Sequence, residues 1–197
     1  MQALILAGGL GTRLRPLTLN TPKPIVPIGN QPFLLRQIES LKSAGVTDIT
    51  LSLNYQPSAI EKLLGNGSEF GVQLRYLIEP SPMGTAGAYK FAEKFLEETT
   101  IVLNGDILTD IDLLSVANKH KQDNALATIV LTPVENPSAY GLVQVGENSD
   151  ILRFLEKPSL EEIERLKINT INAGIYIFEP SVLNYIPANE NYSFEYQ

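Results

Sequence analysis

The sequence contains no cysteine among its 197 residues. A disulfide framework, a thiolate metal site and a cysteine nucleophile are therefore excluded. Its one histidine, His120, lies near the predicted end of a helix, so we expect a solvated side chain and set histidine acid–base catalysis aside. No apolar run is long enough to span a bilayer, and residues 1–6 lack the basic region of a signal peptide. We therefore expect a soluble, cytoplasmic protein.

Acidic residues are missing from the start of the chain. Before Glu39 the only charged side chains are cationic: Arg13, Arg15, Lys23 and Arg36. The whole chain carries a formal net charge of −7, which argues against a nucleic-acid partner. An acidic protein with a purely basic first segment is expected to hold a small anion there, although so short a window can also be basic by chance.

What the sequence does contain is an alternation of apolar strands and amphipathic helices. Strands are predicted at residues 3–7, 46–53, 72–78, 101–103 and 125–131. Helices are predicted between them, at residues 32–44, 57–64, 85–96 and 113–121. This order predicts an α/β fold of three layers, with a Rossmann-like, mostly parallel sheet between helices.

The pattern changes after Pro133. Strands are predicted at residues 141–145, 151–156 and 171–178, with one charged helix at 160–166. We expect a small antiparallel extension over the mouth of the first sheet. The chain is predicted to form a single domain, residues 1–197, with a nucleotide-binding half at 1–132 and a second half at 133–197. Ser193 resembles the N-cap of a helix that continues past Gln197, so we expect the second half to be incomplete.

A glycine-rich loop follows the first strand. Gly8, Gly9 and Gly11 leave backbone amides open to an anion. The spacing is not that of a Rossmann fingerprint, whose third glycine would stand where Leu14 is, and no Gly-Lys-Ser/Thr follows as in a Walker A loop. Arg13 and Lys23 supply cations, and the prolines on both sides of Lys23 predict an extended backbone that aims its ammonium.

A second group of polar residues, Asn104-Gly105-Asp106, follows the strand predicted at 101–103. Ligands of open α/β sheets bind at the carboxyl ends of the strands. Magnesium accepts one or two carboxylates together with substrate phosphates and water. We predict that Asp106 is a Mg²⁺ ligand, although a single aspartate in a turn is as often solvated or capping. Asp110 and Asp112 are expected to cap the next helix.

The pattern GGxGTRLxPLTxxxPKP, at residues 8–24, resembles the sugar-1-phosphate nucleotidylyltransferases, and the mannose-1-phosphate guanylyltransferases among them. The resemblance runs along the whole chain. It implies that Arg13 holds the triphosphate and that Lys23 reaches the α- and β-phosphates. It also implies a nucleotide-binding set that comprises Leu6, Ala7, Gly8, Gly9, Gly11, Thr12, Arg13, Glu79, Gly84 and Thr85.

The base would be recognised by Glu79, in the rigid segment Glu79-Pro-Ser-Pro-Met-Gly84. The resemblance implies that this position contacts the edge of the base, while Gly84 lets the backbone approach its flat face. A carboxylate only accepts hydrogen bonds, which suits the N1–H and N2–H₂ donors of guanine. A solvent-facing Glu79 is the alternative, so thymine and uracil stay open.

The sugar phosphate would bind in the second half of the chain. By the resemblance, Gly141, Glu156 and Asn172 contact sugar hydroxyls and Lys157 binds the phosphate. The resemblance also implies a second metal carboxylate, and elements for homo-oligomer assembly, that we expect beyond residue 197.

These residues predict an enzyme that transfers a nucleotidyl group from a nucleoside triphosphate, GTP by preference, to a sugar 1-phosphate such as mannose 1-phosphate. The nucleophile is already an anion, so no protein base is needed, and catalysis consists of positioning and charge neutralisation. Two alternatives remain open: a thymidylyl- or uridylyltransferase that acts on glucose 1-phosphate, and a regulatory module that binds a nucleotide sugar without turnover.

Overall fold

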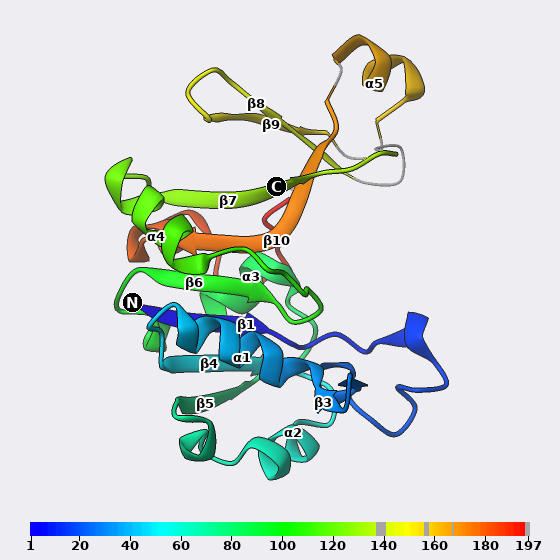
Figure 1. The fold of residues 1–197 in the computed structure, drawn as a ribbon, viewed down its shortest axis with the longest axis vertical. Helices are drawn as coiled ribbons and strands as arrows, with labels where there is room; N and C mark the ends of the chain where they lie inside the picture. Colours follow the sequence, from blue (N-terminus) through cyan, green and yellow to red (C-terminus); the bar gives the residue numbers. More distant parts are fainter. Residues whose placement is uncertain (137–140, 156–157, 167, 196–197) are drawn as a thin grey trace.

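A computed structural model describes residues 1–136, 141–155, 158–166 and 168–195. Its centre is one mixed sheet of eight strands in the order β5-β4-β1-β6-β10-β8-β9, with β7 also paired to β10 (Figure 1). The strands are β1 (Gln2–Leu6), β4 (Asp48–Leu53), β5 (Gln73–Ile78), β6 (Thr100–Asn104), β7 (Ala127–Pro133), β8 (Leu142–Val145), β9 (Ile151–Leu155) and β10 (Thr170–Phe178). Two short strands, β2 (Pro27–Ile28) and β3 (Gln31–Pro32), form a separate hairpin.

The first four strands of the sheet are parallel, and β1 pairs with both β4 and β6. Both faces of β1 are buried because successive side chains point to opposite faces. Ala3 and Ile5 pack into one apolar cluster, whereas Leu4 packs into the other. This explains why the strand is continuously apolar, as buried parallel strands are.

The helices are α1 (Phe33–Ser43), α2 (Pro57–Leu64), α3 (Gly84–Phe91), α4 (Leu113–Gln122) and α5 (Leu160–Leu166). The first four cover the two faces of the sheet, whereas α5 lies away from them in Figure 1. Residues of α1, α2 and α4 pack in the cluster with Ile5, and residues of α3 pack in the cluster with Leu4. The predicted three-layer α/β fold with a mostly parallel sheet and a small antiparallel extension is confirmed. No helix in the described ranges has the length and apolar character needed to cross a membrane.

The antiparallel part continues the same sheet and does not form a separate layer. β10 pairs with β6 along Ile175–Phe178 and with β7 on its other side. Within the described residues, the β8–β9 hairpin pairs with β10 near its start, at Ile171 and Leu142, and it projects beyond β7, away from α1 to α4, in Figure 1. Between Asn172 and Tyr176 the register with β7 shifts, and Gly174 within that shift has a φ of 72°.

Two local predictions were wrong. The helix predicted at 85–96 ends at Phe91 and is followed by a 3₁₀ turn, Glu93–Phe95. Lys23 begins a 3₁₀ turn, Lys23–Ile25, so the extended backbone is limited to Pro22, with φ −53° and ψ 138°. Ser193 accepts from the Glu195 amide at 3.2 Å, as an N-cap does, and residues 194 and 195 form a turn, while the continuation of the predicted helix lies outside the described residues.

The prediction that His120 is solvated was also wrong. It is buried, with 2% of its surface exposed, although its neighbours in α4 are charged. Its Nδ1 lies 2.7 Å from the hydroxyl of Thr128 in β7, and its Nε2 lies 3.2 Å from the carboxylate of Glu179. Thr99 also donates to Glu179, at 2.8 Å. This histidine therefore links α4 to the sheet, and it lies at the end of β6 away from the carboxyl ends that carry the candidate site.

Candidate active site

The glycine-rich loop leaves the carboxyl end of β1 and is held closed by Thr18. The Thr18 hydroxyl donates to the carbonyl of Gly11 at 2.7 Å. Gly11 has a φ of 62°, and a Cβ there would lie 3.0 Å from side-chain atoms of both Thr18 and Lys23. A glycine is required because the backbone is left-handed and packs this closely. The loop then turns at Thr12–Leu14, where Thr12 and Arg13 are exposed.

Lys23 and Asp106 form the charged centre of the site. The Lys23 ammonium lies 2.6 Å from Oδ2 of Asp106, which follows β6. Gly105 allows this placement, since a Cβ there would lie 2.7 Å from the Leu6 carbonyl that accepts from the Gly105 amide. Gln37 of α1 holds the same turn by donating to the carbonyls of Asn104 and Ile107. The structure therefore brings the predicted lysine and the predicted metal ligand together.

Arg13 stands near this pair and makes no hydrogen bond or ion pair within the described part of the chain. It lines a pocket of about 360 Å³ together with Lys23 and Asp106, and apolar side chains form the remaining wall. A neighbouring pocket of about 220 Å³ shares Lys23 and Asp106 and is also lined by Leu6, Ala7 and Gly9. An anion bound here would meet two cations and the open amides of the loop.

Glu79 is buried at the carboxyl end of β5, with 7% of its surface exposed. Its Oε1 accepts the hydroxyl of Ser52 at 2.8 Å, and its Oε2 accepts the amide of Met83 at 3.3 Å. Burial raises the pKa of Glu79, and these two hydrogen bonds act in the opposite direction. A Cβ on Gly8 would lie 2.9 Å from Oε1, so the loop can pass Glu79 only as glycine. The expected alternative, a solvent-facing Glu79, is wrong.

Glu79 also lines a pocket of about 250 Å³ with Gly8, Gly9, Gly84 and Thr85. A carboxylate has about four acceptor positions, and the protein uses one on each oxygen. Acceptor capacity therefore remains for a ligand in this pocket. Gly84 lines the same pocket, but a Cβ there would lie 2.4 Å from the Tyr192 carbonyl oxygen, so packing alone requires this glycine, and its contact with a flat base stays a prediction.

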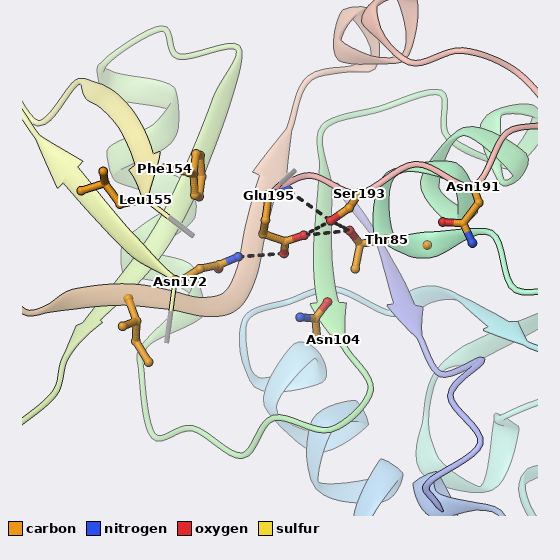
Figure 2. Close-up of a pocket in the computed structure, with 11 residues that line it drawn as sticks. Thr85, Asn104, Phe154, Leu155, Asn172, Asn191, Ser193 and Glu195 are labelled. Atoms are coloured by element: carbon orange, nitrogen blue, oxygen red, sulfur yellow. Dashed lines mark hydrogen bonds between the residues drawn. The ribbon is translucent and has the colours of Figure 1, made fainter. Parts of the chain in front are cut away.

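A larger pocket, about 550 Å³, lies between α3 and the antiparallel strands (Figure 2). Gly141 and Asn172, whose contact with the sugar stays a prediction, both line it, whereas Glu156 and Lys157 lie outside the described residues. The Asn172 side chain is held within the protein: Oδ1 accepts from the Gly174 amide at 2.8 Å, and Nδ2 donates to Tyr176 and to Glu195. Thr85 lines this pocket and the two smaller pockets that contain Gly9, so the three adjoin.

Sequence reasoning missed Ser52 and Glu195. Ser52 is fully buried in β4, where a polar residue at an apolar position was a signal for a buried partner. Glu195 accepts from four side chains around the large pocket, but it lies 110 positions from its partner Thr85, and no local pattern indicates such a contact.

The residues present fit a divalent cation in part. Asp106 offers a carboxylate beside the phosphate-sized pocket, in line with the preference of Mg²⁺ for oxygen ligands. Over the described ranges, no three His, Cys, Asp or Glu side chains gather as a metal site. Asp106 is therefore the candidate ligand that the described residues offer beside Lys23.

Comparison with known proteins agrees with this geometry. The nucleotidyl transferase family model matches residues 2–196. A mannose-1-phosphate guanyltransferase of Yarrowia lipolytica is 49% identical over 191 residues, covering 94% of this chain and 51% of that protein. The Candida albicans protein of the same name is 45% identical over 192 residues, with 94% and 52% covered. The chain thus spans about half the length of the curated relatives it matches.

Two solved structures are similar throughout the fold. A Bacillus anthracis protein, named as a glucose-1-phosphate thymidylyltransferase and solved with a sucrose, has a TM-score of 0.84 at 28% identity, covering 94% of this chain and 74% of that one. HddC from Yersinia pseudotuberculosis, solved with GMP-PN, has a TM-score of 0.81 at 31% identity, covering 100% and 84%. The family match over nearly the whole chain and the identity to these relatives show that this chain belongs to the nucleotidyl transferase family.

Proposed function

We propose that this chain forms the reacting part of a sugar-1-phosphate guanylyltransferase, which transfers a guanylyl group from GTP to mannose 1-phosphate and releases pyrophosphate. The observation that carries the proposal is the contact between three pockets: one beside Glu79, one beside Lys23 and Asp106, and one beside Asn172. A base, a phosphate chain and a sugar can occupy adjoining positions in that order. The names of the Yarrowia and Candida relatives support the choice of substrates.

In the proposed reaction, a phosphate oxygen of the sugar 1-phosphate attacks the α-phosphorus of GTP. The new O–Pα bond forms as the bond from Pα to the bridging oxygen of the β-phosphate breaks, and pyrophosphate leaves with that electron pair. Arg13 and Lys23 offset charge on the triphosphate, and Lys157 is proposed to hold the sugar phosphate. Fixed cations of this kind act by positioning and by stabilising the transition state.

Asp106 is the residue proposed to hold Mg²⁺, which would supply further charge neutralisation on the phosphates when bound. In the structure its Oδ2 accepts from Lys23. That contact keeps the Lys23 ammonium beside the pocket in which the phosphates would lie, so Asp106 also aims the lysine. A cytoplasmic location and assembly with further copies through elements beyond residue 197 belong to the same proposal.

The proposal is tested by measuring pyrophosphate release from GTP and mannose 1-phosphate by this chain and by a longer form of the protein. Arg13→Ala should raise the barrier by about 2–4 kcal/mol, because an aimed charge that faces the transition state is lost. Arg15→Ala is the matched control, since Arg15 is an exposed cation of the same loop. Equal turnover in wild type and Arg13→Ala would remove Arg13 from the mechanism.

A second candidate is transfer of a thymidylyl or uridylyl group to glucose 1-phosphate, which the name of the Bacillus anthracis protein supports. Competition among GTP, dTTP, UTP and ATP separates the two, because Glu79 should prefer the donors of guanine. A third candidate is a module that binds a nucleotide sugar without turnover, which is favoured by the lack of a three-residue acidic or histidine cluster over the described ranges. Tight GTP binding by both chain lengths with no pyrophosphate released would favour that module.

A further inference from the structure

Residues 190–195, here called the strap, cross from the N-terminal end of α3 to β10. The backbone of Tyr192 forms hydrogen bonds with the start of α3. Its amide donates to the carbonyl of Met83 at 2.9 Å, and its carbonyl accepts from the amides of Ala86 and Gly87 at 3.0 Å. The first amides of a helix have no partner within the helix, and here the strap supplies one. The fit is close, since a Cβ on Gly84 would lie 2.4 Å from the Tyr192 carbonyl oxygen.

Glu195 joins the strap to both walls of the large pocket. Its Oε1 accepts from the Tyr176 hydroxyl at 2.7 Å and from Asn172 Nδ2 at 3.0 Å, and both belong to β10. Its Oε2 accepts from Thr85 of α3 at 3.3 Å and from Ser193 of the strap. Figure 2 shows this carboxylate between Asn172 on one side and Thr85 and Ser193 on the other. Burial, and then the charge of Glu195, raise the pKa of Tyr176, so its phenol stays protonated and donates.

The consequence for Asn172 is a fixed orientation. Both hydrogens of its amide are used, on Tyr176 and Glu195, and its oxygen accepts from the Gly174 amide. The oxygen retains one further acceptor position, and because Asn172 lines the large pocket, it can offer an acceptor to a ligand there only while the amide is held this way round. An asparagine without such partners can flip and present a donor instead.

We propose that Glu195 is a positioning residue of the sugar-phosphate pocket, which orients Asn172 of β10 and ties it to Thr85 of α3. The proposal rests on the proposed function in that the pocket takes a sugar 1-phosphate. Glu195 acts unequally on the two substrates, because it lines the pocket with Asn172 but not the pocket with Glu79. Thr85 keeps a second partner without it, since its hydroxyl also accepts from the Phe194 amide at 3.0 Å.

The experiment compares the wild-type chain with Glu195→Ala, Glu195→Gln and Glu190→Gln. Glu190 is the matched control, because it is an exposed carboxylate in the same strap. Calorimetry measures Kd for mannose 1-phosphate and for GTP separately. Glu195→Ala should weaken mannose 1-phosphate binding about tenfold, the effect of losing a hydrogen bond to a charged group, and leave GTP binding within about twofold. Glu195→Gln keeps the shape and one acceptor, so it should restore part of the loss.

A readout without ligand separates this inference from the proposed function. In a nitrogen-15 correlation spectrum, the side-chain amide resonances of Asn172 should move in Glu195→Ala and stay in place in Glu190→Gln. If the wild-type chain binds neither substrate, the proposed function fails. The positioning role is tested even then, because Asn172 resonances that do not move in Glu195→Ala would overturn it. Equal weakening of both substrates by Glu195→Ala, with no recovery in Glu195→Gln, would reduce Glu195 to a general contributor to stability and overturn the inference.

Discussion

Gly8 lies against the carboxylate of Glu79, where a Cβ would come within 2.9 Å of Oε1. Glu79 cannot easily move away, since Ser52 and Met83 hold it in a buried position. Gly8→Ala should therefore lower the free energy of unfolding by about 1–3 kcal/mol, as overpacking in a core does. Gly9→Ala is the control, because no atom lies within 4 Å of a Cβ at that position. Urea unfolding of the two variants makes the comparison, and equal losses would contradict it.

Glu79 should also make stability depend on pH. Burial raises its pKa in the folded chain above the ordinary value of 4.5, so the folded state holds this proton more tightly than the unfolded state does. The resulting stabilisation is present below that ordinary value and is lost as pH rises through the raised folded pKa. Glu79→Gln cannot titrate, so the stability of wild type relative to Glu79→Gln should fall over this pH interval. If the free energies of unfolding of the two proteins changed in parallel with pH, the raised pKa of Glu79 in the folded chain would be contradicted.

At the scale of elements, His120 connects three of them. It extends from α4 to Thr128 in β7 and to Glu179 after β10. His120→Ala leaves a cavity and two polar groups with a lost partner, so the free energy of unfolding should fall by about 2–4 kcal/mol. Lys121→Ala, the exposed neighbour in the same helix, should change it by less than about 0.5 kcal/mol. Similar losses in both variants, measured by thermal unfolding, would contradict the structural role of the histidine.

The elements were predictable where one periodicity dominates. Helix α2 spans the predicted residues 57–64, between Pro57 and Gly65, which mark its two ends. The backbone of Lys23 and the burial of His120 were mispredicted for a common reason. The local sequence favours an extended Lys23 and a solvated His120, but contacts with residues far away in the sequence determine the conformation of the first and the burial of the second. Lys23 turns toward Asp106, 83 positions away, and His120 is buried by β7 and by Glu179.

The candidate site follows the same division. Gly8, Lys23, Glu79 and Asp106 come from short motifs at strand ends, and the structure gathers them at one edge of the sheet. The assignments of these residues to substrates remain predictions. Glu195 was missed because its four partners come from α3, β10 and the strap, and no spacing within the sequence links them.

At the scale of the whole molecule, β10 belongs to the predicted second half of the chain but lies between two strands of the first half. It pairs with β6 on one side and with β7 on the other, and β7 has no other strand partner in the described part of the sheet. Ile175, Tyr176, Ile177 and Phe178 are all at least 97% buried. These contacts favour the proposal that residues 1–197 form a single domain, in which the first half cannot be stable alone.

A chain of residues 1–133 should therefore fail to fold. Burying one large apolar side chain contributes about 1.5–3 kcal/mol, so the four residues of β10 contribute roughly 6–12 kcal/mol. That amount is comparable to the whole stability of a typical domain, about 5–15 kcal/mol. Residues 1–197 should unfold in one transition, so the unfolding curves from far-ultraviolet and near-ultraviolet circular dichroism should coincide. The near-ultraviolet signal comes from tyrosine, because the chain has no tryptophan. A well-dispersed amide spectrum from residues 1–133, or two separate transitions in the whole chain, would show instead that the nucleotide-binding half is a domain by itself.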